Sequence, residues 1–212
     1  MKNLVLFWGW TRNEHTYQRL IGSAPADWRI YRVSYEQLIP HGDMQLFKQN
    51  FLKFLEENKL SKFYLAGHSL RGALSLDFTY HFPNKVQELF LIDSAGVYDF
   101  QAIHHEVKAM LNRHPKYKSF SDPRWASLKR ILRHPILHAR LGLHAHFVDL
   151  QKEASEIKTP TTIMWGADDK LTPVRQGERL HELIKGSKFI VLQGEGHDWI
   201  LFYPELFWEN II

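Results

Sequence analysis

Short runs of apolar residues alternate along the chain with longer segments in which apolar residues recur every three or four positions. Most of these runs are too continuous for strands with one face in water, and such continuity is typical of a sheet covered on both sides. The runs are LVLFWG (4–9), WRIYRV (28–33), KFYLAG (62–67), ELFLID (88–93), TTIMWG (161–166) and KFIVLQ (188–193). We therefore predict six strands.

Helical periodicity separates the predicted strands. Residues 44–60 and 69–82 each place apolar side chains on one face, and residues 174–186 end in a glycine, which is a common helix stop. Strands that alternate with helices form parallel βαβ units with right-handed crossovers. The predicted fold class is α/β, with a mostly parallel central sheet of about six strands and helices on both faces.

Residues 98–159 have a different character. They hold 11 lysines and arginines against six acidic residues, a net charge of +5, whereas the whole chain of 212 residues carries +4. They contain no convincing strand, and their helical pieces are broken by Pro115, Pro123 and Pro135. We expect a helical lid at 98–159, inserted into an α/β core made of residues 1–97 and 160–212.

Composition limits the chemistry and the location. The chain has no cysteine, which excludes disulfides, thiolate metal sites and a cysteine nucleophile. The apolar start of the chain is interrupted by Gly9 and followed by polar TRNEHT, so we interpret it as a buried strand rather than a signal peptide. No stretch reaches the ~18 apolar residues of a membrane span. We expect a cytoplasmic protein without stable membrane insertion.

Two binding functions are weakly supported. The basic segment lacks a glycine-rich or aromatic-interleaved recognition motif, so we expect no nucleic-acid partner, although an anionic membrane surface or an acidic substrate fits its charge. His144 and His146 would share a face only in a strand, and no carboxylate cluster at ligand spacing accompanies them. We therefore expect no metal and no cofactor.

The stretch AGHSLRGA (66–73) is the first candidate for catalytic chemistry. It joins a predicted strand to a predicted helix, which is the context in which a serine of a G-x-S motif is exposed on a sharp turn. Gly67 has no Cβ to obstruct the turn, and the amide of Leu70 points from the helix N-terminus toward an anion. Ser69 is thus a candidate nucleophile, and a serine that only caps the helix is the alternative.

A serine nucleophile needs a base and an acid that orients it. Asp168 and Asp169 follow the fifth predicted strand, and His197 follows the sixth. Since the carboxyl ends of parallel strands lie at one edge, we expect these residues to converge there with Ser69. Asp93 closes the fourth predicted strand and is the second-choice acid.

The chain resembles the α/β-hydrolase superfamily, in particular its lid-bearing serine esterases and lactonases. The resemblance extends along nearly the whole length, through FWGW, GHSLRG, LIDSAG, WGADDKLTP and GEGHDW. It implies that Asp169, three residues after the glycine of WGADD, is the catalytic acid. It also implies an oxyanion hole made by the backbone amides of Trp10 and Leu70.

Three features depart from the pattern of the superfamily. The first two strands are lacking, Trp8 replaces a histidine, and Arg71 replaces the second glycine of the elbow. A large side chain at 71 should push the helix away or point outward, and Gly72 should relieve part of the crowding. Arg71 either forms a structural salt bridge or reaches the site and binds an acidic group.

The expected function is a serine hydrolase that cleaves carboxylic esters of short to medium acyl chains, or lactones, through Ser69, His197 and Asp169. The small-molecule substrate would contact Trp8, Phe100 and Phe147, aromatic residues near the predicted loops and in the lid. The alternatives are a C–C bond or thioester hydrolase with the same triad, and a ligand-binding homologue without catalysis. An exposed sheet edge could pair two copies, so a monomer and a homodimer both stay open.

Overall fold

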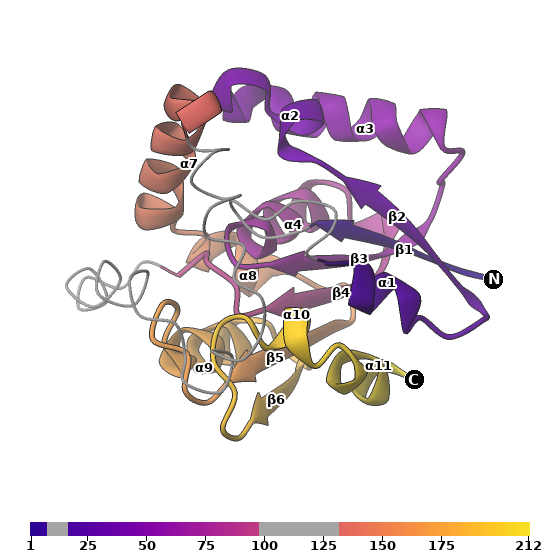
Figure 1. The fold of residues 1–212 in the computed structure, drawn as a ribbon, viewed down its shortest axis with the longest axis vertical. Coiled ribbons are helices and arrows are strands. Elements are labelled where there is room, and N and C mark those ends of the chain that lie inside the picture. Colours follow the sequence, from indigo (N-terminus) through magenta and orange to yellow (C-terminus); the bar gives the residue numbers. More distant parts are fainter. Residues whose placement is uncertain (8–16, 98–131) are drawn as a thin grey trace.

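The central element is a six-stranded parallel sheet with strand order β2-β1-β3-β4-β5-β6. The structure is a computed structural model and describes residues 1–7, 17–97 and 132–212. The strands are β1 (Lys2–Phe7), β2 (Trp28–Val33), β3 (Phe63–His68), β4 (Val86–Ile92), β5 (Thr161–Gly166) and β6 (Lys188–Leu192). Each of the six predicted strands is confirmed. The chain therefore has the predicted α/β class (Figure 1).

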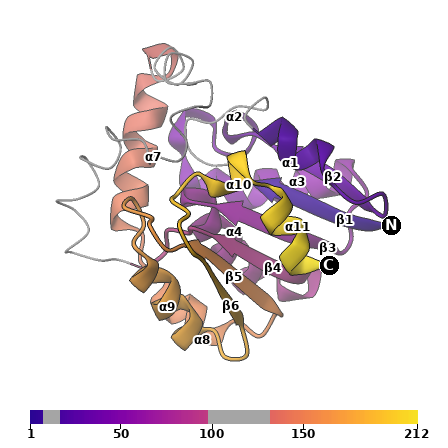
Figure 2. The ribbon, with the colours of Figure 1, turned by 60° about the horizontal axis from the view of Figure 1, so that its bottom comes forward.

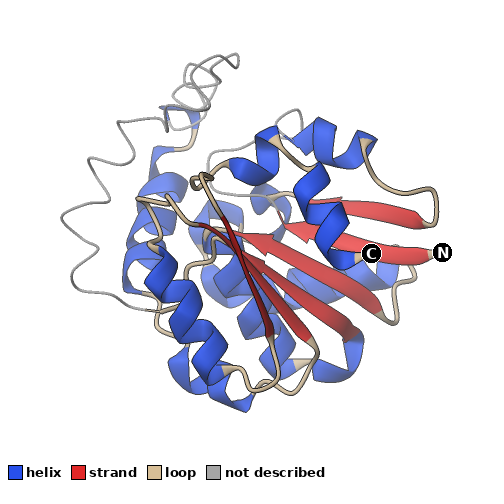
Figure 3. Cartoon of the chain, turned by 90° about the horizontal axis from the view of Figure 1, so that it is seen from below, coloured by secondary structure: helices blue, strands red, loops and turns tan. Residues whose placement is uncertain are grey.

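Helices cover both faces of the sheet (Figure 3). On one side lie α2 (Tyr35–Leu38), α3 (Phe47–Glu57), α4 (Leu70–His81), α8 (Gln151–Glu156) and α9 (Val174–Leu183). On the other side lie α1 (Gln18–Gly22), α10 (Trp199–Phe202) and α11 (Glu205–Ile211). Short 3₁₀ turns at Pro40–Gly42, Met44–Leu46 and Pro83–Lys85 complete the connections. In Figure 2, α10 and α11 cross in front of the sheet.

Alternation along each strand divides the core into two layers. In β1, Val5 and Phe7 contribute to the layer with α3 and α4, whereas Leu4 and Leu6 contribute to the layer with α1, α10 and α11. Successive side chains of a strand point to opposite faces, so a continuous apolar run is what a doubly covered strand requires. The apolar runs in the sequence are therefore continuous because helices cover both faces of these strands.

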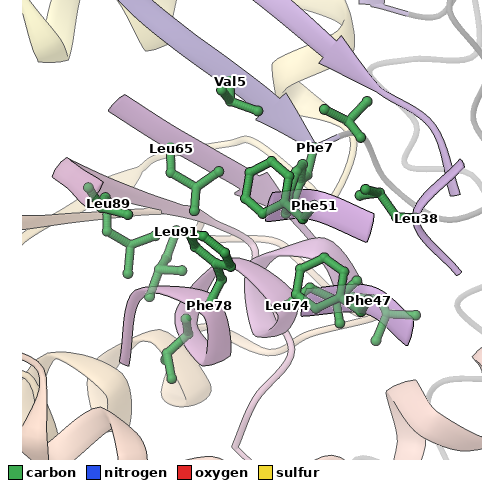
Figure 4. Close-up of a cluster of buried hydrophobic side chains, with 14 of the residues drawn as sticks. Val5, Phe7, Leu38, Phe47, Phe51, Leu65, Leu74, Phe78, Leu89 and Leu91 are labelled. Atoms are coloured by element: carbon green, nitrogen blue, oxygen red, sulfur yellow. The ribbon is translucent and has the colours of Figure 1, made fainter. Parts of the chain in front are cut away.

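Aromatic packing anchors α3 on the sheet (Figure 4). The ring of Phe51 is fully buried and meets Phe7 and Phe78 edge-on, at centroid distances of 4.7 and 4.5 Å. Edge-to-face pairs at this spacing add to the free energy gained by burying the rings. Phe51 therefore joins a sheet strand and two helices in one cluster.

The expected lid falls partly outside the described residues, because 98–131 are not among them. Within 132–159 the chain forms α7 (Pro135–Phe147), which contacts Pro40–Gly42, and α8, which packs on α4 and α9. In Figures 1 and 2, α7 stands on the side toward which the strands point. The boundaries of a lid domain remain a prediction. None of the helices in the described part of the chain is long and apolar enough to cross a membrane.

Candidate active site

The carboxyl edge of the sheet brings together the turns that follow four neighbouring strands. Ser69 follows β3, Asp93 follows β4, Asp169 lies in the loop after β5, and His197 lies in the loop after β6. One polar side-chain atom from each of Asp93, Asp169 and His197 lies within 4.8 Å of the others. Parallel strand direction thus gathers the polar residues that the sequence singled out.

Ser69 occupies a strained backbone conformation. Its φ is 60° and its ψ is −132°, a combination that L-residues rarely adopt and that costs about 1–3 kcal/mol. Two hydrogen bonds hold it: the Ser69 amide donates to the carbonyl of Ile92 at 3.0 Å, and its own carbonyl accepts from the amide of Ala95 at 3.1 Å. Ile92 is the last residue of β4 and Ala95 lies in the turn that follows, so the end of the neighbouring strand and its loop hold the strained turn. Such a turn is the geometry of a nucleophile elbow.

Arg71 lies inside α4 and does not prevent the elbow. Its residue exposure is only 2%, so the side chain is covered by its neighbours. A Cβ at Gly67 would collide with the carbonyl of Arg71 and with Oγ of Ser75, and a Cβ at Gly72 would collide with the side chain of Ser94. The helix therefore approaches β3 and β4 closely at these two glycines. The close packing at Gly72 lies one position after the place where the superfamily pattern puts its second glycine.

His197 is oriented by Asp169. Its Nδ1 donates to Oδ2 of Asp169 at 2.7 Å, and the Asp169 side chain is fully buried. The other oxygen of Asp169, Oδ1, accepts from the amides of Leu171 and Thr172 at 2.7 and 3.0 Å. A carboxylate with these donors is well suited to carry a negative charge. With Nδ1 protonated, Nε2 of His197 keeps its lone pair.

Thr172 adds a third group to this pair. Its hydroxyl donates to Oδ2 of Asp169 at 2.6 Å and lies 3.1 Å from Nδ1 of His197. The same hydroxyl lies 3.1 Å from the carbonyl oxygen of Asp93. One side chain thus contacts all three residues of the cluster and restrains the Asp169 carboxylate.

The residue before Ser69 connects the turn after β3 to the loop that carries His197. Nε2 of the buried His68 lies 2.9 Å from the carbonyl oxygen of His197, so this nitrogen is the protonated donor. Nδ1 of His68 then accepts from the hydroxyl of Tyr17 at 2.9 Å. Two consecutive hydrogen bonds, from Tyr17 to His68 and from His68 to the backbone of His197, therefore connect the start of α1 to the loop after β6.

Asp93 is the most deeply buried acid of the cluster. Its side chain accepts the amide hydrogen of Gly166 through Oδ1 at 2.9 Å. Burial raises the pKa of Asp93 well above its usual range, and the nearby charge of Asp169 raises it further, while the Gly166 amide and the Trp199 indole lower it. The sequence ranked Asp93 as an alternative acid, but His197 makes its hydrogen bond with Asp169.

Several predicted site residues lie outside the described part of the chain. These are Trp8 and Phe100 of the expected pocket and Trp10 of the expected oxyanion hole. Leu70, the other expected oxyanion donor, begins α4 and is buried. Phe147 ends α7 and is 61% exposed.

Sequence reasoning missed three contributors to the site: Thr172, His68 and Tyr17. Thr172 stands in WGADDKLTP, three residues after Asp169, where a hydroxyl can reach back to the carboxylate of a turn. His68 stands beside Ser69 in the elbow motif. Tyr17 has no local signal, because 51 positions separate it from its partner.

Comparison with known proteins agrees with this architecture. No protein-family model matches the chain. Over 235 aligned positions the chain is 24% identical to the pimeloyl-(acyl-carrier protein) methyl ester esterase of Neisseria meningitidis serogroup B / serotype 15, with 98% of this chain and 90% of the relative covered. It is 26% identical over 173 positions to a 2-hydroxy-6-oxononadienedioate/2-hydroxy-6-oxononatrienedioate hydrolase of Escherichia coli O139:H28, covering 68% of this chain and 58% of the relative.

The fold is also that of known hydrolase structures. The crystal structure of a hydrolase from Pseudomonas aeruginosa PA01 superimposes with a TM-score of 0.77 at 17% identity. The match covers 99% of this chain and 88% of that chain. At this identity the similarity concerns the arrangement of the elements, and the chemistry has to be argued from the site.

Proposed function

We propose that this member of the α/β-hydrolase superfamily, a carboxylic ester hydrolase, cleaves its substrate through Ser69, His197 and Asp169. The observation that carries the proposal is the 2.7 Å hydrogen bond from Nδ1 of His197 to a buried carboxylate, at the edge where Ser69 has the strained turn of a nucleophile elbow. The bond assigns the proton to Nδ1, so Nε2 of the imidazole is available as a base.

The chemistry follows from these roles. Nε2 of His197 takes the proton of the Ser69 hydroxyl as the oxygen attacks the ester carbonyl carbon, and Asp169 stabilises the imidazolium that forms. The imidazolium then protonates the leaving alcohol, and a water activated by His197 releases the acid from Ser69.

An oxyanion develops in both steps and needs donors. The amide of Leu70 at the start of α4 supports one donor, because the first amides of a helix have no partner within the helix. The amide of Trp10 is the second donor that we propose. Loss of one such donor costs roughly 3–4 kcal/mol in comparable sites.

We propose esters of short to medium acyl chains, or lactones, as the substrates. Support comes from the relative that acts on a methyl ester, and from the aromatic residues that the sequence places in the predicted loops and in segment 98–159. In this proposal the segment is a lid whose apolar side chains select the acyl chain.

Burst kinetics with p-nitrophenyl esters of increasing chain length test the mechanism. We expect a burst equal to the enzyme concentration, covalent labelling by a fluorophosphonate probe, and a loss of several orders of magnitude in turnover for Ser69→Ala. Asp168→Asn is the matched control for Asp169→Asn, because Asp168 is adjacent in the loop but only half-buried. The control should lose far less turnover than Asp169→Asn, because the hydrogen bond to Nδ1 of His197 comes from Asp169.

The same experiment decides among the alternatives. Near-normal turnover in Ser69→Ala would overturn the nucleophile. Labelling without ester turnover would favour the C–C bond hydrolase, and the relative that acts on a 2-hydroxy-6-oxo-dienedioate makes such a compound the next substrate to assay. Ligand binding with neither labelling nor turnover would favour the non-catalytic homologue.

A further inference from the structure

Asp93 has an environment that does not suit a charged carboxylate. The residue is wholly buried, and its Oδ1 has one donor, the amide of Gly166. Its Oδ2 is buried and has no hydrogen-bond partner within the described part of the chain. Burying a carboxylate oxygen without a donor is costly for the ionised form and much less so for the protonated form.

Asp169, by contrast, has the donors that a charge requires. Its two oxygens accept from two amides, from the hydroxyl of Thr172 and from Nδ1 of His197. The two carboxyl groups approach each other within 4.8 Å, and like charges at that spacing in a buried site disfavour double ionisation. When one of the two acids is protonated and the other is ionised, the proton is therefore more stable on Asp93.

We propose that Asp93 is a positioning residue that keeps its proton while Asp169 is ionised, so that His197 faces one negative charge. This proposal rests on the proposed function, because it concerns the acid of the same triad. In the protonated form, the hydroxyl of Asp93 is a donor for the neighbouring carboxylate. The proton stays on Asp93 throughout turnover, so each hydrolysis still moves only the proton of Ser69 and that of the attacking water.

The surroundings of Asp93 support retention of the proton. Within the described residues, the titratable groups that lie against it are Asp169 from the loop after β5 and His197 from the loop after β6. Desolvation and the Asp169 charge raise the pKa of Asp93, and the amide of Gly166 and the nearby indole of Trp199, both neutral, oppose this only in part. The raised pKa of Asp93 therefore agrees with the hydrogen bonding of its Oδ1 and Oδ2, which also favours the protonated form.

Infrared difference spectroscopy tests the protonation without using activity. We expect wild-type protein at neutral pH to show the carbonyl stretch of a protonated carboxylic acid, shifted in D₂O, and Asp93→Asn to lack it. Asp169→Asn should move the titration of this band to lower pH, because the negative charge of Asp169, which raises the pKa of Asp93, is removed. Absence of the band in wild type, or its persistence in Asp93→Asn, would overturn the proposal.

The pH dependence of kcat/KM tests the positioning role. Asparagine at position 93 is neutral like the protonated acid and keeps an acceptor and a donor. Asp93→Asn should therefore keep the acidic limb of the wild-type profile and recover most of the kcat that Asp93→Leu loses. Asp93→Leu removes the donor, and we expect kcat to fall about tenfold with little change in KM, as for a displaced catalytic group. An ionised Asp93 would instead raise the pKa of His197, and Asp93→Asn would then move the acidic limb down by about one unit or more.

Failure of this inference is distinguishable from failure of the proposed function. Ser69→Ala reports on the nucleophile, and it should retain the infrared band whether or not Ser69 is catalytic. If Ser69→Ala is inactive and the band is absent, only the role of Asp93 is wrong. If Ser69→Ala is active and the band is present, the protonated acid stands, and the mechanism around it has to be replaced.

Discussion

Nε2 of His68 donates to the carbonyl oxygen of His197 across 2.9 Å, so the residue before the proposed nucleophile holds the backbone of the proposed base. The two imidazole rings lie 4.9 Å apart between centroids. This bond joins the end of β3 to the loop after β6, although the two residues are 129 positions apart in the chain. Catalysis by proton transfer depends on such positioning, since a displacement of about 1 Å can cost a factor of 10².

The bond from His68 can be tested by substitution. His68→Leu should lower kcat about 10- to 100-fold with a smaller change in KM, because the base loses its support while the substrate pocket is retained. His68→Gln, whose amide nitrogen can reach the position of Nε2, should recover part of the loss. Steady-state kinetics of both variants check this, and equal activities in Leu and Gln variants would contradict it.

We expect the hydroxyl of Thr172, and not the rest of its side chain, to affect turnover. Thr172→Val has nearly the same shape but removes the donor to Oδ2 of Asp169. Hydrogen bonds to charged groups contribute about 1.5–3 kcal/mol, so we expect kcat to fall roughly tenfold or more. Thr172→Ser, measured in the same assay, should stay near wild type. A Val variant as active as the Ser variant would show that the amides of residues 171 and 172 suffice.

The close approach of α4 to the end of β4 predicts the effect of adding a methyl group. In Gly72→Ala the new Cβ meets the side chain of Ser94, and overpacking of this kind costs about 1–3 kcal/mol. Gly22→Ala is the matched control, because nothing lies within 4 Å of its new Cβ. Urea unfolding curves measure both. Equal free energies of unfolding in the two variants would mean that α4 moves away from Ser94 at little cost. In that case the turnover of Gly72→Ala should fall, because the turn at Ser69 would move with the helix.

The raised pKa of Asp93 makes stability depend on pH. The ordinary value for this group is 3.8, so above that pH the unfolded chain releases a proton that the folded chain keeps. Folding stability from this group is therefore fully present at low pH and decreases as the pH rises toward the folded pKa, by at most about tenfold in the equilibrium constant per unit. Asp93→Asn has no such proton and should gain stability relative to wild type as the pH rises.

Urea midpoints measured across a pH series check this dependence. A constant difference between Asp93→Asn and wild type at all pH values would contradict a proton held at this position.

The aromatic cluster on α3 predicts a stability effect away from the site. Phe51→Ala removes a fully buried ring from contact with Phe7 and Phe78, and such truncations cost about 3–5 kcal/mol. Phe51→Leu should cost less because it leaves a smaller cavity. Thermal and urea unfolding of both variants measure the difference, and a loss below about 1 kcal/mol would mean that the layer repacks.

The sequence by itself determined which elements form and where polar residues interrupt them. Short apolar runs predicted all six strands, and most of these runs are continuous because a strand covered on both faces cannot alternate with polar residues. The ends of those strands carry Ser69, Asp93, Asp169 and His197, and parallel direction alone predicts that they share one edge. Local pattern is sufficient for these statements.

Only the tertiary structure decided how those residues are paired and supported. That His197 bonds Asp169, that Asp93 is left with an oxygen lacking a donor, and that Tyr17 reaches His68 depend on the packing of segments far apart in the chain. The burial of Arg71 has the same origin, since exposure depends on neighbours and not on residue type. Hydrogen-bond partners and local dielectric are properties of the packed edge, so no periodicity in the sequence encodes them.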